Sequence, residues 1–111
     1  MQYLLLIYEN EKRFSQGYDE AEMKEYQALG EEFAKSIKGS NALQPTAAAK
    51  TVRRRNGKTA TCDGPFAETK EQLGGYYLVE AADIDAATKI AAKIPAVRFG
   101  SVEIRPIMTF S

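Results

Sequence analysis

The segment that most constrains this chain is Tyr3–Tyr8, because it predicts a β-strand that is apolar on both faces. Successive side chains of a strand point to opposite sides, so the odd-numbered and the even-numbered residues of this segment form two faces, and both sets are apolar. A second strand, predicted over 74–81, has the same property in its run Tyr-Tyr-Leu-Val. A sheet built on these two strands needs cover on both of its faces.

Two other segments have helical periodicity. In the first, Asp19 and Glu22 have the spacing of an N-cap residue and its N3 carboxylate, and Gly39 is placed to end the helix. The apolar stripe predicted for this helix consists of Met23, Tyr26, Leu29, Gly30, Phe33, Ala34 and Ile37. The second helix is predicted over 84–94, with Asp83 as its cap and Pro95 as its stop.

Residues 50–63 predict a β-hairpin, because Asn56-Gly57 between two β-prone segments is the strongest short turn signal. With a two-residue turn, Lys50 faces Asp63 and Arg54 faces Thr59, and these side chains share one polar face. The run Asp-Gly-Pro-Phe at 63–66 then breaks the pattern as a turn, in which we expect Phe66 to fill the core.

The order of these elements, with a last strand over 101–110, is β–α–β-hairpin–β–α–β in one domain of 111 residues. We therefore predict an α+β fold: a ferredoxin-like α/β plait with an extra β-hairpin, whose two helices lie on one face of a mostly antiparallel sheet. The other, apolar face is left uncovered. A second copy is the simplest cover, which predicts a homodimer packed sheet against sheet.

Composition argues against several function classes. Lys and Arg total 15, as do Asp and Glu, so no net charge attracts nucleic acid or an acidic membrane surface. The chain has no His and one cysteine, Cys62, which argues against a metal site and an internal disulfide. No apolar run has the length of a membrane span or the form of a signal peptide. We expect a soluble cytoplasmic protein without a metal ion or a cofactor.

The run Asp-Gly-Pro-Phe-Ala-Glu-Thr-Lys-Glu at 63–71, followed by the strand at 74–81, resembles the signature of the YCII-related superfamily, in its DGPF subgroup. The first strand and the element order are also similar along nearly the whole chain. The resemblance implies a dimeric α/β barrel of ferredoxin-like protomers. One branch of the superfamily contains a dehydrochlorinase for a chlorinated hydroxyquinol with a proposed histidine–aspartate pair. Since this chain has no His, only Asp63 matches a motif position.

Asp63 is the candidate catalytic residue. At the mouth of a barrel, a partly desolvated carboxylate has a raised pKa and can act as a general base, or it can anchor a small ligand. The alternative is structural: Asp63 begins an Asx-type turn, which Gly64 shapes, or pairs with Lys50 across the hairpin.

The candidates for ligand binding are Arg54, Lys50, Tyr76, Tyr77 and Gly64. The two basic residues lie near Asp63 in the predicted hairpin, where they could bind an anionic ligand or charge an exposed edge against strand pairing. One of the two tyrosines should face the cavity of the dimer and donate a hydrogen bond, with packing as the alternative. Gly64 supplies the unusual backbone conformation of the turn.

Two functions remain. In the first, the chain binds or transforms a small aromatic or anionic molecule in the pocket of the dimeric barrel, with Asp63 as base or anchor. In the second, it is a non-catalytic regulatory or interaction protein linked to an extracytoplasmic-function sigma factor, as DGPF-type proteins often accompany such factors. The change Asp63→Asn separates the two, because only the first function depends on this carboxylate.

Overall fold

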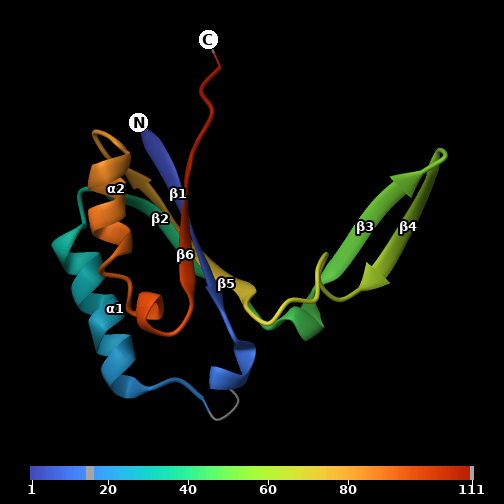
Figure 1. Cartoon of the computed structure of the whole chain (residues 1–111), viewed down its shortest axis with the longest axis horizontal. Helices are drawn as coiled ribbons and strands as arrows, with labels where there is room; N and C mark the ends of the chain where they lie inside the picture. Colours follow the sequence, from blue (N-terminus) through green and yellow to red (C-terminus); the bar gives the residue numbers. More distant parts are fainter. Residues whose placement is uncertain (15–16, 111) are drawn as a thin grey trace.

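The computed structural model describes residues 1–14 and 17–110. The strands of these residues are β1 (Gln2–Glu9), β2 (Ile37–Ala42), β3 (Lys50–Arg55), β4 (Lys58–Asp63), β5 (Gln72–Glu80) and β6 (Ser101–Pro106). The helices are α1 (Glu20–Glu32) and α2 (Ile84–Ala91), with short 3-10 turns η1 (Glu11–Phe14), η2 (Thr46–Ala48) and η3 (Pro95–Arg98) (Figure 1). Neither helix of the described chain is long and apolar enough to cross a membrane.

Strands β2, β5, β1 and β6 form one antiparallel sheet in that order. The connection β1–α1–β2 passes over β5, and the connection β5–α2–β6 passes over β1, so both helices lie on the same side of the sheet (Figure 1). The predicted α+β class is confirmed, and this strand order is compatible with the predicted ferredoxin-like plait. The dimeric barrel stays a prediction.

The core fills the space between the sheet and the helices. Alternation along β1 buries Tyr3, Leu5 and Ile7, which pack with Val79 of β5 in one cluster. The helices add side chains that are also buried: Leu29 of α1, Ala87, Ile90 and Ala91 of α2, and Ile94 and Ala96 after it. The apolar odd-numbered face of the first strand is thus covered by the chain itself.

The even-numbered face of the first strand has no such cover. Leu4 pairs with Leu78 and Leu6 pairs with Tyr76 across β1 and β5, and all four side chains are only half-buried. Together with Tyr8 they form what we call the open face, on the side of the sheet away from both helices (Figure 1). This is the uncovered apolar face that the sequence predicts.

Helix α1 is shorter than its sequence pattern predicts. It ends at Glu32 rather than near Gly39, because Ile37 and Gly39 belong to β2 and pair with β5. The hydrogen bonds of this sheet edge outweigh continuation of the apolar stripe into a longer helix. Three residues that were expected on the buried stripe are exposed: Met23, Gly30 and Ala34.

The β3–β4 hairpin has the register that the sequence predicts, with Lys50 opposite Asp63 and Arg54 opposite Thr59. Asn56 and Gly57 form its turn with φ values of 53° and 76°, as a type I′ turn requires. We call residues 50–63 the arm, because they stand away from the rest of the molecule, on the side of the sheet opposite the helices (Figure 1).

Candidate functional site

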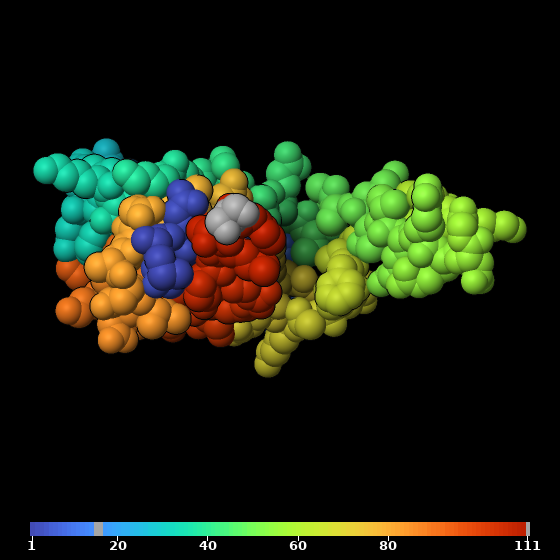
Figure 2. All heavy atoms as spheres, turned by 90° about the horizontal axis from the view of Figure 1, so that it is seen from above, coloured from blue at the N-terminus to red at the C-terminus, as the bar shows by residue number. Residues whose placement is uncertain are grey.

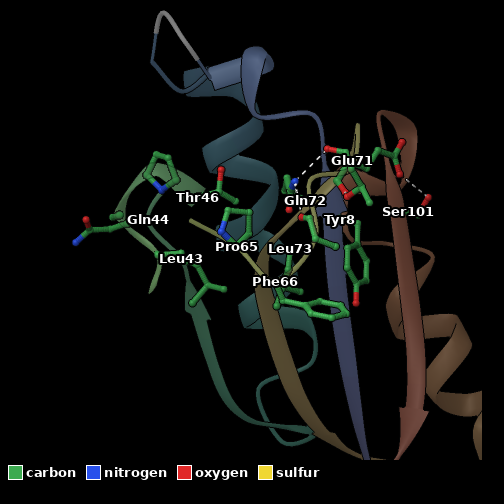
Figure 3. Close-up of a pocket in the computed structure, with 15 residues that line it drawn as sticks. Tyr8, Leu43, Gln44, Thr46, Pro65, Phe66, Glu71, Gln72, Leu73 and Ser101 are labelled. Carbon is green, nitrogen blue, oxygen red and sulfur yellow. Dashed lines mark hydrogen bonds between the residues drawn. The ribbon is translucent and has the colours of Figure 1, made fainter. Parts of the chain in front are cut away.

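Two cavities lie beside the sheet. The helix-side cavity, of about 650 Å³, is lined by residues of β1, η1, α1, β2 and β5. The second, of about 1040 Å³, is bordered by the loop after the arm and by residues of β1 and β5 (Figure 3). The helix-side cavity is the one into which buried charged groups converge.

The charged centre of the helix-side cavity consists of Glu9, Arg13 and Glu22. The Arg13 guanidinium donates to a Glu9 carboxylate oxygen at 2.8 Å and to both Glu22 oxygens at 2.9 and 3.2 Å. The two carboxylate side chains are only 7% and 5% exposed, and the arginine side chain is 26% exposed. Both carboxylates line the cavity, and Arg13 holds them from outside its lining. Buried charges of this kind persist only when they are paired.

Three local features bring these residues together. Glu9 continues the inward-facing set of β1, so its carboxylate lies on the same side as the buried core residues. Glu22 lies on the first turn of α1 and faces the sheet in the same stripe as Tyr26 and Leu29. The guanidinium of Arg13 stacks on the ring of Phe99, 3.9 Å from the centroid, and this contact fixes its position.

The role found for Glu22 corrects the sequence analysis. Asp19 caps α1 as predicted, since its side chain accepts from the backbone N–H of Ala21 at 3.0 Å. Glu22 does not complete a capping box, because Arg13 binds its carboxylate instead. A buried ion pair has therefore replaced the predicted surface cap interaction.

Two tyrosines supply polar groups to the same cavity. Burial, together with the negative charges of Glu9 and Glu22, raises the pKa of Tyr26 far above its ordinary value. Burial also raises the pKa of Tyr77. Both side chains are therefore neutral phenols at physiological pH and can donate a hydrogen bond to an oxygen or nitrogen placed in the cavity.

Comparison with known protein families identifies the family of this chain. A family model of the YCII-related domain matches residues 1–111 of the chain. The chain belongs to the YCII-related family. It is 38% identical to an uncharacterized protein of Rhizobium meliloti over 117 aligned positions, which cover 99% of this chain and 94% of that protein.

Most of the predicted site residues of this YCII-related chain lie on or beside the arm. The side chain of Asp63 is 90% exposed and its carboxylate lies 3.6 Å from the Lys50 ammonium, which is the structural alternative given above. The Arg54 guanidinium lies 3.5 Å from the Thr59 hydroxyl. Gly64 has a φ of 104° and donates its N–H to the Ala49 carbonyl at 2.7 Å. None of the four predicted residues Lys50, Arg54, Asp63 and Gly64 lines either cavity described here.

The two predicted tyrosines both border the helix-side cavity, but only the Tyr77 side chain lies on the side of the buried carboxylates, and the Tyr76 side chain lies on the open face. Tyr77 shares the helix side with Leu5, its partner in the ladder. The Tyr76 hydroxyl accepts a hydrogen bond from the Asn41 side-chain amide at 2.9 Å. The sequence motif and the buried charged centre are therefore separate parts of this YCII-related chain.

The loop after the arm forms one wall of the second cavity, where Pro65 and Phe66 lie with Tyr8 and Leu73 (Figure 3). The Phe66 side chain is 80% exposed, so it does not fill the core of the chain as expected. The reason is its position: the loop lies at the base of the arm, beyond the sheet. A ring as exposed as this one on an apolar cavity is available for contact with another molecule.

Sequence reasoning missed the Glu9–Arg13–Glu22 centre, although a signal for it is present. Glu9 follows Tyr3, Leu5 and Ile7 at the period of a strand, which places a carboxylate on the buried face. Such a position needs a cationic partner within reach, and Arg13 is the second basic residue after it.

Proposed function

We propose that this YCII-related chain binds a small aromatic molecule that carries a positive charge or several hydrogen-bond donors, in the helix-side cavity. The observation that supports this proposal is that two buried carboxylates, Glu9 and Glu22, line that cavity while a single arginine pairs with both. The centre therefore has one negative charge in excess.

The size and walls of the cavity fit such a ligand. A volume of about 650 Å³ lies within the range of known small-molecule sites. Its lining residues include the aromatic residues Phe14, Tyr18, Tyr26 and Tyr77, whose rings are flat surfaces suited to contact with an aromatic ligand. The excess negative charge disfavours an anionic ligand here, because like charges repel strongly where water is scarce.

The test is a binding experiment with matched probes. Benzylamine and benzoate have the same ring and opposite charges, and each is titrated into the isotope-labelled protein while the amide NMR spectrum is recorded. We expect benzylamine at millimolar concentration to shift the amides of Glu22 and Gly75, which border the cavity, and benzoate to leave them in place. Binding of benzoate at these amides, or binding of neither probe, contradicts the proposal.

Two variants locate the binding. Glu9→Gln removes one carboxylate from the cavity and should weaken benzylamine binding at least about tenfold. The reason is that a hydrogen bond to a charged group contributes more binding free energy than one to a neutral group, by roughly the amount that corresponds to a tenfold change in affinity. Asp63→Asn is the matched control, because it makes the same chemical change on the arm. Loss of binding in Asp63→Asn alone would instead support Asp63 as the anchor of the ligand, as the sequence analysis proposes.

A subgroup, a cellular compartment and a regulatory role are proposed for this chain as well. Membership of the DGPF subgroup rests on the run at 63–71, and a cytoplasmic location rests on the single cysteine. The regulatory alternative, a link to an extracytoplasmic-function sigma factor, has no feature of the described residues in its favour. Co-purification with such a factor, with unchanged yield in Glu9→Gln, would support that alternative against ligand binding.

A further inference from the structure

The arm lacks the packing that a two-stranded hairpin needs. All of its residues except Thr51 are exposed, including Val52 at 61%. A hairpin of two strands is marginally stable in water unless a third strand or another surface packs against it. Its junction with the rest of the molecule is local: Gly64 binds the Ala49 carbonyl, and the Thr51 hydroxyl donates to the Gly64 carbonyl at 2.9 Å.

The position of the arm leaves space beside it for a large partner. The sheet lies between the helices on one side and the arm on the other, so the arm and the open face border the same space (Figure 1). In the space-filling view the arm extends well beyond the rest of the molecule (Figure 2). The radius of gyration is 15.9 Å, compared with about 13 Å for a compact chain of similar length.

The charge of the arm identifies the chemistry of that partner. Its basic residues outnumber its single acid, Asp63, by four; they are Lys50, Arg53, Arg54, Arg55 and Lys58. Because Lys and Arg equal Asp and Glu in the whole chain, the remainder of the chain, which we call the body, has a net charge of −4. An arm of +4 and a body of −4 are complementary, and they belong to the same molecule.

One pair in the arm is unfavourable without a partner. Arg55 lies directly opposite Lys58, and like charges facing each other across two strands destabilise a hairpin. Among the described residues only the Lys50–Asp63 ion pair involves the arm. Carboxylates from another molecule would relieve this repulsion and pair with the free cations.

We infer that the arm docks on the acidic body of a second copy of this chain, which is seated against the open face. This goes beyond the proposed ligand site, because it assigns a partner to a surface that the ligand does not touch. Nucleic acid is a weaker match for the arm, since the acidic body beside it would repel a polyanion. In the docked pair each arm supplies positive charge that each body lacks.

Cys62 makes this contact measurable, because it is the one cysteine of the chain and lies exposed on the arm. One copy carries a nitroxide spin label on Cys62. The other copy is isotope-labelled, has Cys62→Ser, and is refolded together with the first. We expect the label to broaden body amides of the second copy, and the exposed acids Glu20, Glu31, Glu68 and Asp85 identify segments where broadening is expected.

Two matched pairs of substitutions distinguish the effect of the charges on the arm from the effect of the net charge of the whole chain. Arg53→Glu with Arg55→Glu should abolish the broadening and weaken self-association about tenfold or more. Lys24→Glu with Lys38→Glu makes the same change in net charge on exposed body residues and should preserve both. If the variant with Arg53→Glu and Arg55→Glu unfolds, the variant with Arg53→Gln and Arg55→Gln is tested in its place.

Three outcomes would overturn the inference. The first is absence of broadening between copies at millimolar protein, and the second is broadening that survives in the reversed arm. The third is binding of a random-sequence oligonucleotide by the arm while the chain sediments as a monomer. A dimer that forms without broadening would show sheet packing alone and would leave the proposed ligand site unaffected.

Discussion

Arg13 is the single side chain that keeps two buried carboxylates in place. Replacement by Met retains much of the side-chain volume but leaves Glu9 and Glu22 without their cation. We expect Arg13→Met to lower the free energy of unfolding by about 3 kcal/mol, because removal of one partner leaves uncompensated buried charge. Urea unfolding followed by circular dichroism measures this change.

Arg98→Met is the matched control for that substitution. Arg98 binds Glu25 through two hydrogen bonds of 2.7 and 2.8 Å, but both side chains are about half exposed. Water screens such a pair, so a much smaller loss of stability is expected. Adding Glu9→Gln and Glu22→Gln to Arg13→Met should restore part of the stability. Equal losses in the two arginine variants would contradict the assignment of a buried charged centre.

Tyr26 should make the free energy of unfolding depend on pH in the alkaline range. Its pKa in the folded protein is raised above the ordinary value of 10.0, so the folded state keeps the phenol proton at a pH where the unfolded state has lost it. The unfolded state then binds fewer protons, and the stability contribution of Tyr26, complete below about pH 10, falls as the pH rises further.

Unfolding by urea at a series of pH values tests this dependence. Tyr26→Phe should have a shallower fall in stability above about pH 10 than the parent protein. Tyr18→Phe, which removes the same hydroxyl from a ring that is 62% exposed, is the matched control. A parent protein whose stability is flat through this range would show that Tyr26 ionises as readily folded as unfolded.

At the scale of elements, the sequence predicts best where the signal is local. The arm has its predicted register because Asn56 and Gly57 alone specify the turn, and the turn aligns both strands. The predicted end of α1 was wrong, because Phe33 and Ile37 continue the helical spacing of apolar residues beyond Glu32, where the helix ends. The pairing of β2 with β5 decides where the helix ends. Pairing between strands that are distant in the sequence cannot be recognised from the local spacing of apolar residues.

Two glycines in this fold have opposite structural roles. Gly30 lies exposed near the end of α1, and an added methyl group would meet no atom within 4 Å. Gly100 lies just before β6, where an added Cβ would be 2.1 Å from the Tyr8 carbonyl oxygen. The first position tolerates a side chain, and the second is closed by the backbone of β1.

The two substitutions to alanine should therefore differ in sign. Gly30→Ala should stabilise the protein by about 0.5–1 kcal/mol, because alanine loses less conformational freedom in a helix. Gly100→Ala should destabilise it by about 1–3 kcal/mol, because the backbone of β6 must move away from β1. Thermal unfolding of both variants measures the difference, and a stabilised Gly100→Ala would refute the close approach of these strands.

At the scale of the whole molecule, the sequence predicts the layers but not the charged centre. Alternation in β1 shows that both faces of the sheet are apolar, and this requires a layer of helices on one side. Glu9, Arg13 and Glu22 come from three different elements, so each of them alone is typical of a solvated surface. Their burial follows only from closure of η1 and α1 over the end of β1.

The open face leads to a prediction about assembly. We propose a homodimer in which this face packs against the same face of a second copy, because the stripe that includes Leu4, Leu6 and Leu78 is apolar and no other element of the described chain covers it. Leu6→Lys places a charge at the centre of the stripe without touching the core, since Leu6 faces away from both helices. The variant should keep its circular dichroism spectrum and sediment as a monomer at micromolar concentration.

Gln27→Lys on the exposed side of α1 adds the same charge elsewhere and should leave the dimer intact. A parent protein that sediments as a monomer would contradict the dimer itself. A Leu6→Lys variant that remains dimeric would place the contact on another surface, and the arm is then the first surface to examine. Because the arm borders the open face, the two contacts reinforce each other: apolar burial at the open face holds the copies together, and the charged arms fix their relative orientation.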